Sequence, residues 1–408
     1  MLSSGSLMQA NPKSHESPSR FVVFAYGFRP FFLLVGIWAI VPMGTIVWAS
    51  TSGRWPVDAI PLFTWHGHEM LFGCVAAAIA GFLLTAVPTW TGIRAISGVR
   101  LIFLVVLWGA GRIASAPWMQ MPNAFVQLLG IAFFPALALT VAVPLVRTKS
   151  TRNLPFLVFL TLLFIADLAY QAPRFGWADN SPFDGLRLAL NTVVLLIVIV
   201  GGRIVPAFTR NALVQLGRPV AIRSFLALDV IAIGAVAGVL FGDLFAKNSD
   251  VAGVLAGLAS IFLAARLALW NGWRTRDIPL LWVLHLGYSW IVVGLALKAL
   301  WLLGDFAWAM NWMHALTAGG FGTMILGVMT RVALGHTGRP LIVSRYVAAS
   351  YLLITAAAAL RVWGPWLVPG QYLQVLAASV VAWIAGFALF LLLYTPILVR
   401  PRVDGKAG

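Results

Sequence analysis

Charged side chains are scarce in this sequence. Of its 408 residues, 10% are charged and 61% are hydrophobic, whereas soluble domains have about 25% charged and about 45–50% apolar residues. The mean hydropathy is +0.92. The interior of a water-soluble fold cannot bury so many apolar side chains, so much of the surface must face lipid. The composition therefore excludes an ordinary soluble domain and predicts a protein embedded in a bilayer.

Cysteine and acidic residues are also few. The single cysteine, Cys74, excludes an internal disulfide, a cysteine-ligated iron–sulfur cluster and any CxxC site. There are 12 acidic residues against 28 Lys and Arg, which gives a net charge of +16. In a membrane protein such an excess indicates basic cytoplasmic loops. No basic block carries interleaved aromatic residues, so we expect no nucleic-acid binding.

Long apolar runs dominate what is present. A membrane-spanning helix needs about 20 mainly apolar residues, and barrel strands would be about ten residues long and alternating. The sequence therefore predicts an all-α, polytopic transmembrane bundle of about twelve spans. Their expected limits are 28–50, 61–89, 99–116, 123–146, 153–172, 185–207, 221–242, 250–270, 279–303, 306–332, 342–363 and 371–398.

The connections between these runs alternate in charge. Basic connections, such as the one with Arg147, Lys149 and Arg152, alternate with connections poor in Lys and Arg. The positive-inside rule then places both termini in the cytoplasm. We expect one transmembrane domain over residues 21–400, with cytoplasmic tails at 1–20 and 401–408. The first tail is polar, lacks the apolar core of a signal peptide and is predicted to be disordered.

The sequence has six histidines, and five of them lie in or beside apolar runs. His15, in the first tail, is expected to have no role. The predicted topology puts three histidines near the outer face and two near the cytoplasmic face. Imidazole is the commonest metal ligand and can ligate haem iron. The alternative for each is a hydrogen bond to a neighbouring helix with no ligand. The outer group is His66, His68 and His314, and the inner group is His285 and His336.

Polar groups concentrate at the start of the second run, in residues 65–70 (WHGHEM). On a regular helix His66, Glu69 and Met70 share one face, and His68 points away from it. We therefore expect His66 and His68 to serve different sites. Histidine with a thioether suits copper, although Met70 also fits simple packing. Glu69 has three possible roles: to carry protons, to orient an imidazole, or to be a buried structural carboxylate.

Arginines form a second set of candidates. Arg29, Arg203 and Arg331 lie at the predicted cytoplasmic ends of spans and could clamp haem propionates or another anion. The alternative is that they reach to lipid headgroups. Arg112 and Arg266 lie deeper in apolar runs, as does Asp167, which could pair with one of them; the sequence does not choose which.

Several longer stretches resemble the NnrS family of bacterial membrane proteins. They run across most of the chain, at 26–32 (YGFRPFF), 65–73 (WHGHEMLFG), 81–88 (GFLLTAVP), 202–206 (GRIVP), 285–288 (HLGY), 314–317 (HALT), 328–331 (VMTR) and 335–340 (GHTGRP). At 89–92 the chain has TWTG where the family usually has NWTG, a departure with no obvious consequence.

The resemblance implies twelve spans, a haem (expected to be b-type), a copper, and a role in nitric oxide metabolism or tolerance at the bacterial inner membrane. It implies the bilayer, nitric oxide and an electron donor as partners. It assigns no ligands, but His66, His68, His285, His314 and His336 each lie in a family-like stretch. We expect His66, His68, His314, Glu69 and Met70 in an outer metal site, and His285 and His336 with Arg203 and Arg331 in an inner one. The alternative is a copper- or proton-coupled transporter. A haem–copper nitric oxide reductase is less favoured, because adjacent His-His and His-Pro-Glu motifs are missing.

Overall fold

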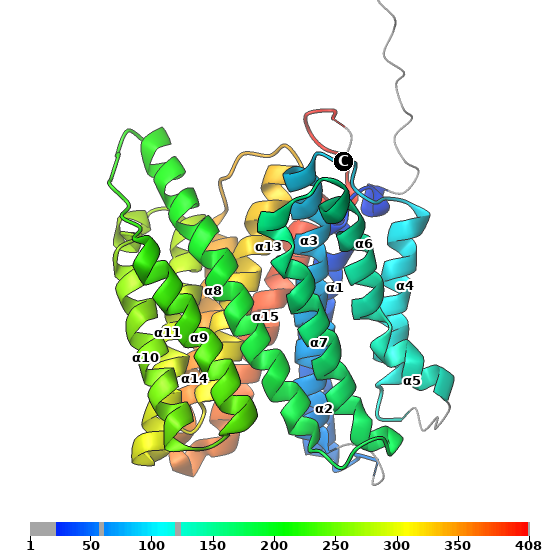
Figure 1. Ribbon diagram of the computed structural model, residues 1–408, viewed down its shortest axis with the longest axis vertical. Helices are drawn as coiled ribbons and strands as arrows, with labels where there is room; N and C mark the ends of the chain where they lie inside the picture. Colours follow the sequence, from blue (N-terminus) through cyan, green and yellow to red (C-terminus); the bar gives the residue numbers. More distant parts are fainter. Residues whose placement is uncertain (1–21, 57–60, 119–123, 407–408) are drawn as a thin grey trace, which may run out of the picture.

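The computed structural model describes residues 22–56, 61–118 and 124–406, and across these ranges the regular elements are all helical (Figure 1). The predicted tail 1–20 lies outside the described residues. The principal helices are α1 (Phe28–Ser52), α2 (Leu62–His68), α3 (Ala76–Thr91), α4 (Val99–Ala114), α5 (Ala124–Ile131), α6 (Phe133–Arg147), α7 (Pro155–Gln171), α8 (Pro182–Gln215), α9 (Leu226–Phe245), α10 (Asp250–Ala268), α11 (Pro279–Gly304), α12 (Trp312–His314), α13 (Thr323–His336), α14 (Arg345–Leu367) and α15 (Tyr372–Val399).

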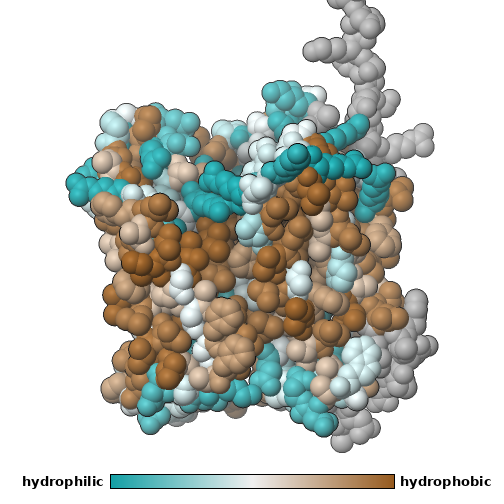
Figure 2. All heavy atoms as spheres, in the orientation of Figure 1, coloured by the Kyte–Doolittle hydropathy of each residue, from teal (hydrophilic) through white to brown (hydrophobic). Residues whose placement is uncertain are grey.

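The predicted all-α membrane bundle is confirmed. Within the described residues, 11 helical segments are long and apolar enough to cross a membrane. Figure 2 shows hydrophobic residues around the middle of the molecule and hydrophilic residues gathered at its two ends. The remaining predicted span corresponds to α4, which has 16 residues. At 1.5 Å per residue α4 is about 24 Å long, somewhat less than the bilayer's hydrocarbon core of about 30 Å.

The two ends of the described chain meet at the same end of the bundle (Figure 1). The buried Arg29, at the start of α1, donates from Nη1 to the carbonyl oxygens of Leu398 and Arg400, at 2.8 Å each. A chain that starts and finishes at one end crosses the membrane an even number of times. The contact therefore supports counting α4 as a crossing, which makes twelve.

The second span is the most enclosed. It runs without a break through α2, a π-helical segment Glu69–Val75 (η2) and α3, and it packs on α1, α6 and α8. Its small residues allow this, since Ala76, Ala77 and Ala80 are fully buried. Gly81 lies so close to Phe32 that an added Cβ would come within 2.6 Å of the ring. Close packing of neighbouring helices therefore accounts for this stripe of small residues.

A second π-helical segment, Ala315–Gly322 (η7), joins α12 to α13. Each π segment begins one residue after a histidine, since η2 follows His68 and η7 follows His314. The π-helix is rare and is often found at functional sites, because its wider turn displaces side chains from their regular helical positions. The spans that carry His68 and His314 therefore share a local distortion that an apolar pattern does not reveal.

Candidate functional site

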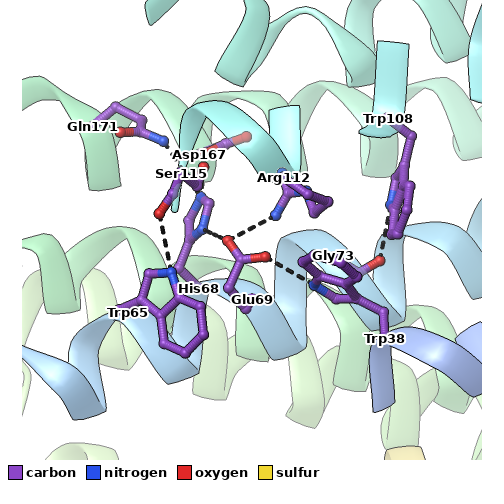
Figure 3. Close-up of polar contacts among 10 residues, drawn as sticks. All are labelled: Trp38, Trp65, His68, Glu69, Gly73, Trp108, Arg112, Ser115, Asp167 and Gln171. Carbon is purple, nitrogen blue, oxygen red and sulfur yellow. Dashed lines mark hydrogen bonds and ion pairs between the residues drawn. The ribbon is translucent and has the colours of Figure 1, made fainter. Parts of the chain in front are cut away.

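A buried cluster of charged side chains surrounds His68, at the end of α2 (Figure 3). Its imidazole is fully buried and lies between two carboxylates. Nδ1 is 2.9 Å from Oε1 of Glu69, and Nε2 is 3.1 Å from Oδ1 of Asp167 on α7. The amide nitrogen of Gln171, one turn further along α7, lies 3.4 Å from the same Nε2. Both ring nitrogens of His68 therefore have polar partners.

Glu69 connects this histidine to two other helices. Nη1 of Arg112, on α4, donates to Oε1 of Glu69 at 3.2 Å, and Nε1 of Trp38, on α1, donates to Oε2 at 2.8 Å. Glu69 is fully buried, and Arg112 and Asp167 are nearly so. A buried carboxylate is tolerated only when it is paired and hydrogen-bonded. The two donors satisfy both oxygens of Glu69 and fix its position.

Aromatic residues enclose the cluster and hold it in place. The ring of Tyr170 stacks on the imidazole of His68, with 4.2 Å between centroids. Nε1 of Trp65 donates to the carbonyl of Ser115 at 3.0 Å, and Nε1 of Trp108 donates to the carbonyl of Gly73 at 3.1 Å. These last two bonds, visible in Figure 3, join the second span to α4 and the residue just after it. The short α4 is thereby anchored beside the charged cluster.

The hydrogen-bond pattern constrains the protons of the cluster. If His68 is doubly protonated, each N–H donates to one carboxylate, and the two cations His68 and Arg112 balance Glu69 and Asp167. A neutral imidazole has only one N–H to donate. The carboxyl group that contacts its other nitrogen must then be protonated, so that it can donate to that nitrogen. In either case one exchangeable proton is shared among His68, Glu69 and Asp167, far from water. This geometry can hold and pass a proton between α2 and α7.

Two expectations for these residues were wrong. Glu69 does not share a site with His66 away from His68, because its carboxylate bonds to His68 directly. Asp167 pairs with His68, and not with either predicted arginine: Arg112 bonds to Glu69 and Arg266 bonds to Asp229. In both cases donors from other helices fix the carboxylate. The spacing of residues along a single helix does not reveal such contacts between helices.

His66 belongs to a different cluster, with His314 and Arg361. The two histidines interact electrostatically with each other, and both interact with Arg361 of α14; His66 also interacts with the carboxylate of Glu69. Nδ1 of His66 is buried and makes no hydrogen bond within the described residues. Arg361 is held by Asn311, since its Nη1 donates to Oδ1 of Asn311 at 3.0 Å. The second span and α12 thus place two imidazoles within electrostatic range of each other and of a guanidinium.

Arg361 was not among the predicted site residues. It lies in α14, between apolar residues, with no motif around it. The sequence feature that could have identified Arg361 was its position deep in an apolar run, which is the property that singled out Arg112 and Arg266. The predicted thioether partner, Met70, packs against the hydrophobic core.

The two inner histidines have separate surroundings. Nε2 of His285, on α11, is 2.9 Å from the hydroxyl of Thr209 on α8. Its Nδ1 is buried without a hydrogen bond in the described residues, and it faces the backbone at Gly272, where an added Cβ would lie 2.4 Å away. His336, at the end of α13, instead packs against Tyr26 and Phe28. The described contacts do not bring the two imidazoles together.

The three arginines proposed as anion clamps also have distinct positions. Arg29 uses its Nη1 to bind the carbonyls at the end of α15. Arg203 is exposed on α8. Arg331 lies over the ring of Phe208, with 4.1 Å from Cζ to the centroid. Of the three, Arg29 has a defined structural role in closing the bundle between its first and last spans.

The fit of each implied cofactor can be tested against these donors. For copper, no group of three or more His, Cys, Asp and Glu side chains among the described residues is placed to hold a metal ion. For haem, the chemistry fits better at His66 and His314, because two imidazoles from different helices can ligate one iron. Arg361 supplies the positive charge that a propionate requires.

The helices and their buried polar clusters define a polytopic helical membrane protein. The sequence model of the NnrS protein family matches residues 22–402, nearly the whole chain. The chain therefore belongs to the NnrS family, as its motifs indicated. No curated protein matches the sequence.

Proposed function

We propose that this protein is a haem-binding protein of the bacterial inner membrane that acts in nitric oxide metabolism or tolerance. Membership of the NnrS family and the membrane bundle support the setting. The observation that carries the proposal is that His66 and His314, on different spans, lie close enough to interact electrostatically. In addition, Nδ1 of His66 is buried without a hydrogen bond among the described residues. A haem bound there would supply an iron able to bind nitric oxide or to pass electrons.

The charge around the pair favours an anionic cofactor. Arg361 interacts with both histidines, and its guanidinium bonds to the neutral side chain of Asn311. This guanidinium would attract the propionates of haem. The carboxylate of Glu69, which also acts on His66, is already bonded to Arg112 and Trp38. In this proposal His66 and His314 bind the iron, Arg361 binds a propionate, and Asn311 keeps Arg361 in position.

His68 has a different role in this proposal. Both of its nitrogens bond to carboxylates, so in this arrangement it offers no lone pair to a metal. Its cluster lies on the same span, two residues from His66. We assign to His68, Glu69 and Asp167 the role of holding a proton near the haem. Movement of that proton would compensate the change in charge when the haem gains or loses an electron or binds a ligand.

The proposal is tested by expressing the full chain with haem available, purifying it in detergent, and recording its optical spectrum and metal content. We expect a haem spectrum that changes when nitric oxide is added anaerobically. The copper implied by the family resemblance is tested by elemental analysis of the same sample. A protein that holds no haem would overturn the proposal, whatever its copper content.

A second candidate function is proton-coupled transport, and the buried His68 cluster is the observation that favours it. A histidine between two carboxylates is a common chemistry for carrying protons through membrane proteins. In proteoliposomes, copper uptake that depends on a pH gradient and is lost in His68→Gln would support transport. Uptake that is absent in the wild type as well would exclude it.

A further inference from the structure

A charged cavity of about 200 Å³ lies between α8 and α9, at the end of the bundle away from the two chain ends. It is separate from both histidine clusters. Asp184, Arg187, Leu188 and Asn191 line it from α8, and Asp243, Leu244 and Lys247 line it from the end of α9 and the connection after it. Most of these side chains are polar, which is unusual for a space between two membrane-spanning helices.

One of the lining residues, Asp243, belongs to a buried ion pair. Nζ of Lys298, on α11, donates to Oδ2 of Asp243 at 2.5 Å, and the amide of Asn191 donates to the same oxygen at 2.8 Å. Lys298 is 1% exposed and Asp243 is 5% exposed. Nζ of Lys298 also lies 4.9 Å from the ring centroid of Trp312. The charge of Asp243 is therefore already committed to Lys298.

Arg187 stands in this cavity without a matching anion. Its Nη1 is buried and has no hydrogen-bond partner among the described residues. The nearby carboxylates are both engaged, because Asp184 pairs with Lys247 at 2.8 Å and Asp243 pairs with Lys298. Arg187 and Lys298 also interact as like charges. A buried, unpaired guanidinium N–H is costly, and such a group normally has a partner.

The balance of charge indicates what that partner is. The charged lining residues, Arg187 and Lys247 against Asp184 and Asp243, balance one another. Lys298, which pairs with Asp243 from behind the lining, adds one positive charge, so the cluster around the cavity has a net charge of +1. One monoanion would neutralise it. We propose that the cavity binds a small monoanionic oxyanion group, held by the buried Nη1 of Arg187. Such a group comes from a dissolved carboxylate or from the phosphodiester of an anionic lipid headgroup.

The size of the cavity agrees with this chemistry. A water molecule occupies about 30 Å³ of liquid, so about 200 Å³ accommodates a group of a few heavy atoms with some water, and not a large cofactor. The ion pair of Lys247 and Asp184 is half exposed. It therefore lies on the solvent side of the cavity, where exchange with water is possible.

The test measures thermal unfolding of the purified full chain in nanodiscs of phosphatidylcholine as sodium acetate is added. A bound anion stabilises the folded protein. We expect acetate to raise the Tm of the wild type and not that of Arg187→Gln. Arg210→Gln is the matched control, because Arg210 is an exposed arginine on the same helix. A second arm replaces part of the lipid by phosphatidylglycerol without acetate.

Two milder variants keep the test decisive if Arg187→Gln fails to fold. Lys247→Gln lowers the net charge of the cavity to zero and should weaken acetate binding by about tenfold, and Asp184→Asn raises it and should strengthen binding by about tenfold. The proposal is supported if, in either arm, the stabilisation is largest for Asp184→Asn, intermediate for the wild type and smallest for Lys247→Gln. The arm in which this occurs identifies the source of the anion. Equal responses of the wild type, Arg187→Gln and Lys247→Gln in both arms would overturn it. None of these readouts depends on haem or copper.

Discussion

Nε2 of His68 lies 3.1 Å from Oδ1 of Asp167, a residue 99 positions later in the chain. This contact joins the second span to α7 inside the membrane, where both side chains are buried. The second span contributes to two clusters. His68 belongs to one, and His66, two residues earlier, interacts electrostatically with His314 in the other.

Replacing Asp167 by asparagine should be strongly destabilising. The change removes one of two carboxylates that balance His68 and Arg112, and breaking a buried charge pair costs about 3–5 kcal/mol. Denaturant unfolding in detergent measures the effect. Asp179→Asn, in an exposed connection, is the control and should change the free energy of unfolding by less than about 0.5 kcal/mol. Similar stabilities for the two variants would show that the cluster contributes nothing to the fold.

Gly185 should be sensitive to substitution by alanine. An added Cβ would lie 2.4 Å from the carbonyl oxygen of Ala166 and 2.5 Å from the backbone nitrogen of Tyr170. The backbone of α7 would have to move, and it carries Asp167 and the ring that stacks on His68. We expect a loss of about 1–3 kcal/mol from overpacking, measured by the same unfolding experiment.

Gly234 is the matched control for Gly185. It is also a helical glycine, on α9, but an added Cβ would meet nothing within 4 Å. Gly234→Ala should leave stability unchanged or raise it by up to about 1 kcal/mol, because alanine favours the helix. Destabilisation of equal size at both positions would contradict the close approach of α7 and α8.

The segment after α15 should loosen at low pH. Arg402 donates from Nη1 to the carbonyl of His336 at 2.7 Å and from Nη2 to Oδ2 of Asp404 at 2.6 Å. The hydrogen bond from Arg402 lowers the pKa of Asp404 below its ordinary value of 3.8. The contact therefore stabilises the folded chain fully above that ordinary value, and it is lost as the pH falls through the lower, folded-state pKa.

Hydrogen exchange of residues 337–340 measures this effect, with Asp404→Asn compared at each pH. The wild type should be better protected than the variant at pH 7. That difference should disappear only in strong acid, below the ordinary pKa of 3.8. A difference that is absent at pH 7, or that vanishes well above that ordinary pKa, would show that Asp404 does not hold this segment.

The sequence predicted the membrane bundle well, because apolar runs of about 20 residues have few alternatives. The residues that close the bundle could not be predicted. Arg29 resembled an anion clamp because it is an arginine at the end of a span. Its bonds to the carbonyls of Leu398 and Arg400 depend on which two spans are neighbours, and hydropathy does not contain that information.

The site was only partly predictable for a similar reason. Spacing predicted different surroundings for His66 and His68, and topology grouped His314 with the outer histidines. The roles of these residues as ligands remain predictions. Glu69 was misplaced because its orientation is set by Trp38 and Arg112, on two other helices. The π-helical segments that follow His68 and His314 have no signature in a pattern of apolar residues.

The most direct measurement of the central claim is the haem content of purified wild type, His66→Ala, His314→Ala and His15→Ala. If His66 and His314 bind the iron, each of their variants should lose most of the haem absorption per mole of folded protein, and Arg361→Gln should retain less than the wild type. His15→Ala, outside the described residues, should match the wild type. Full haem absorption in both His66→Ala and His314→Ala would contradict the account.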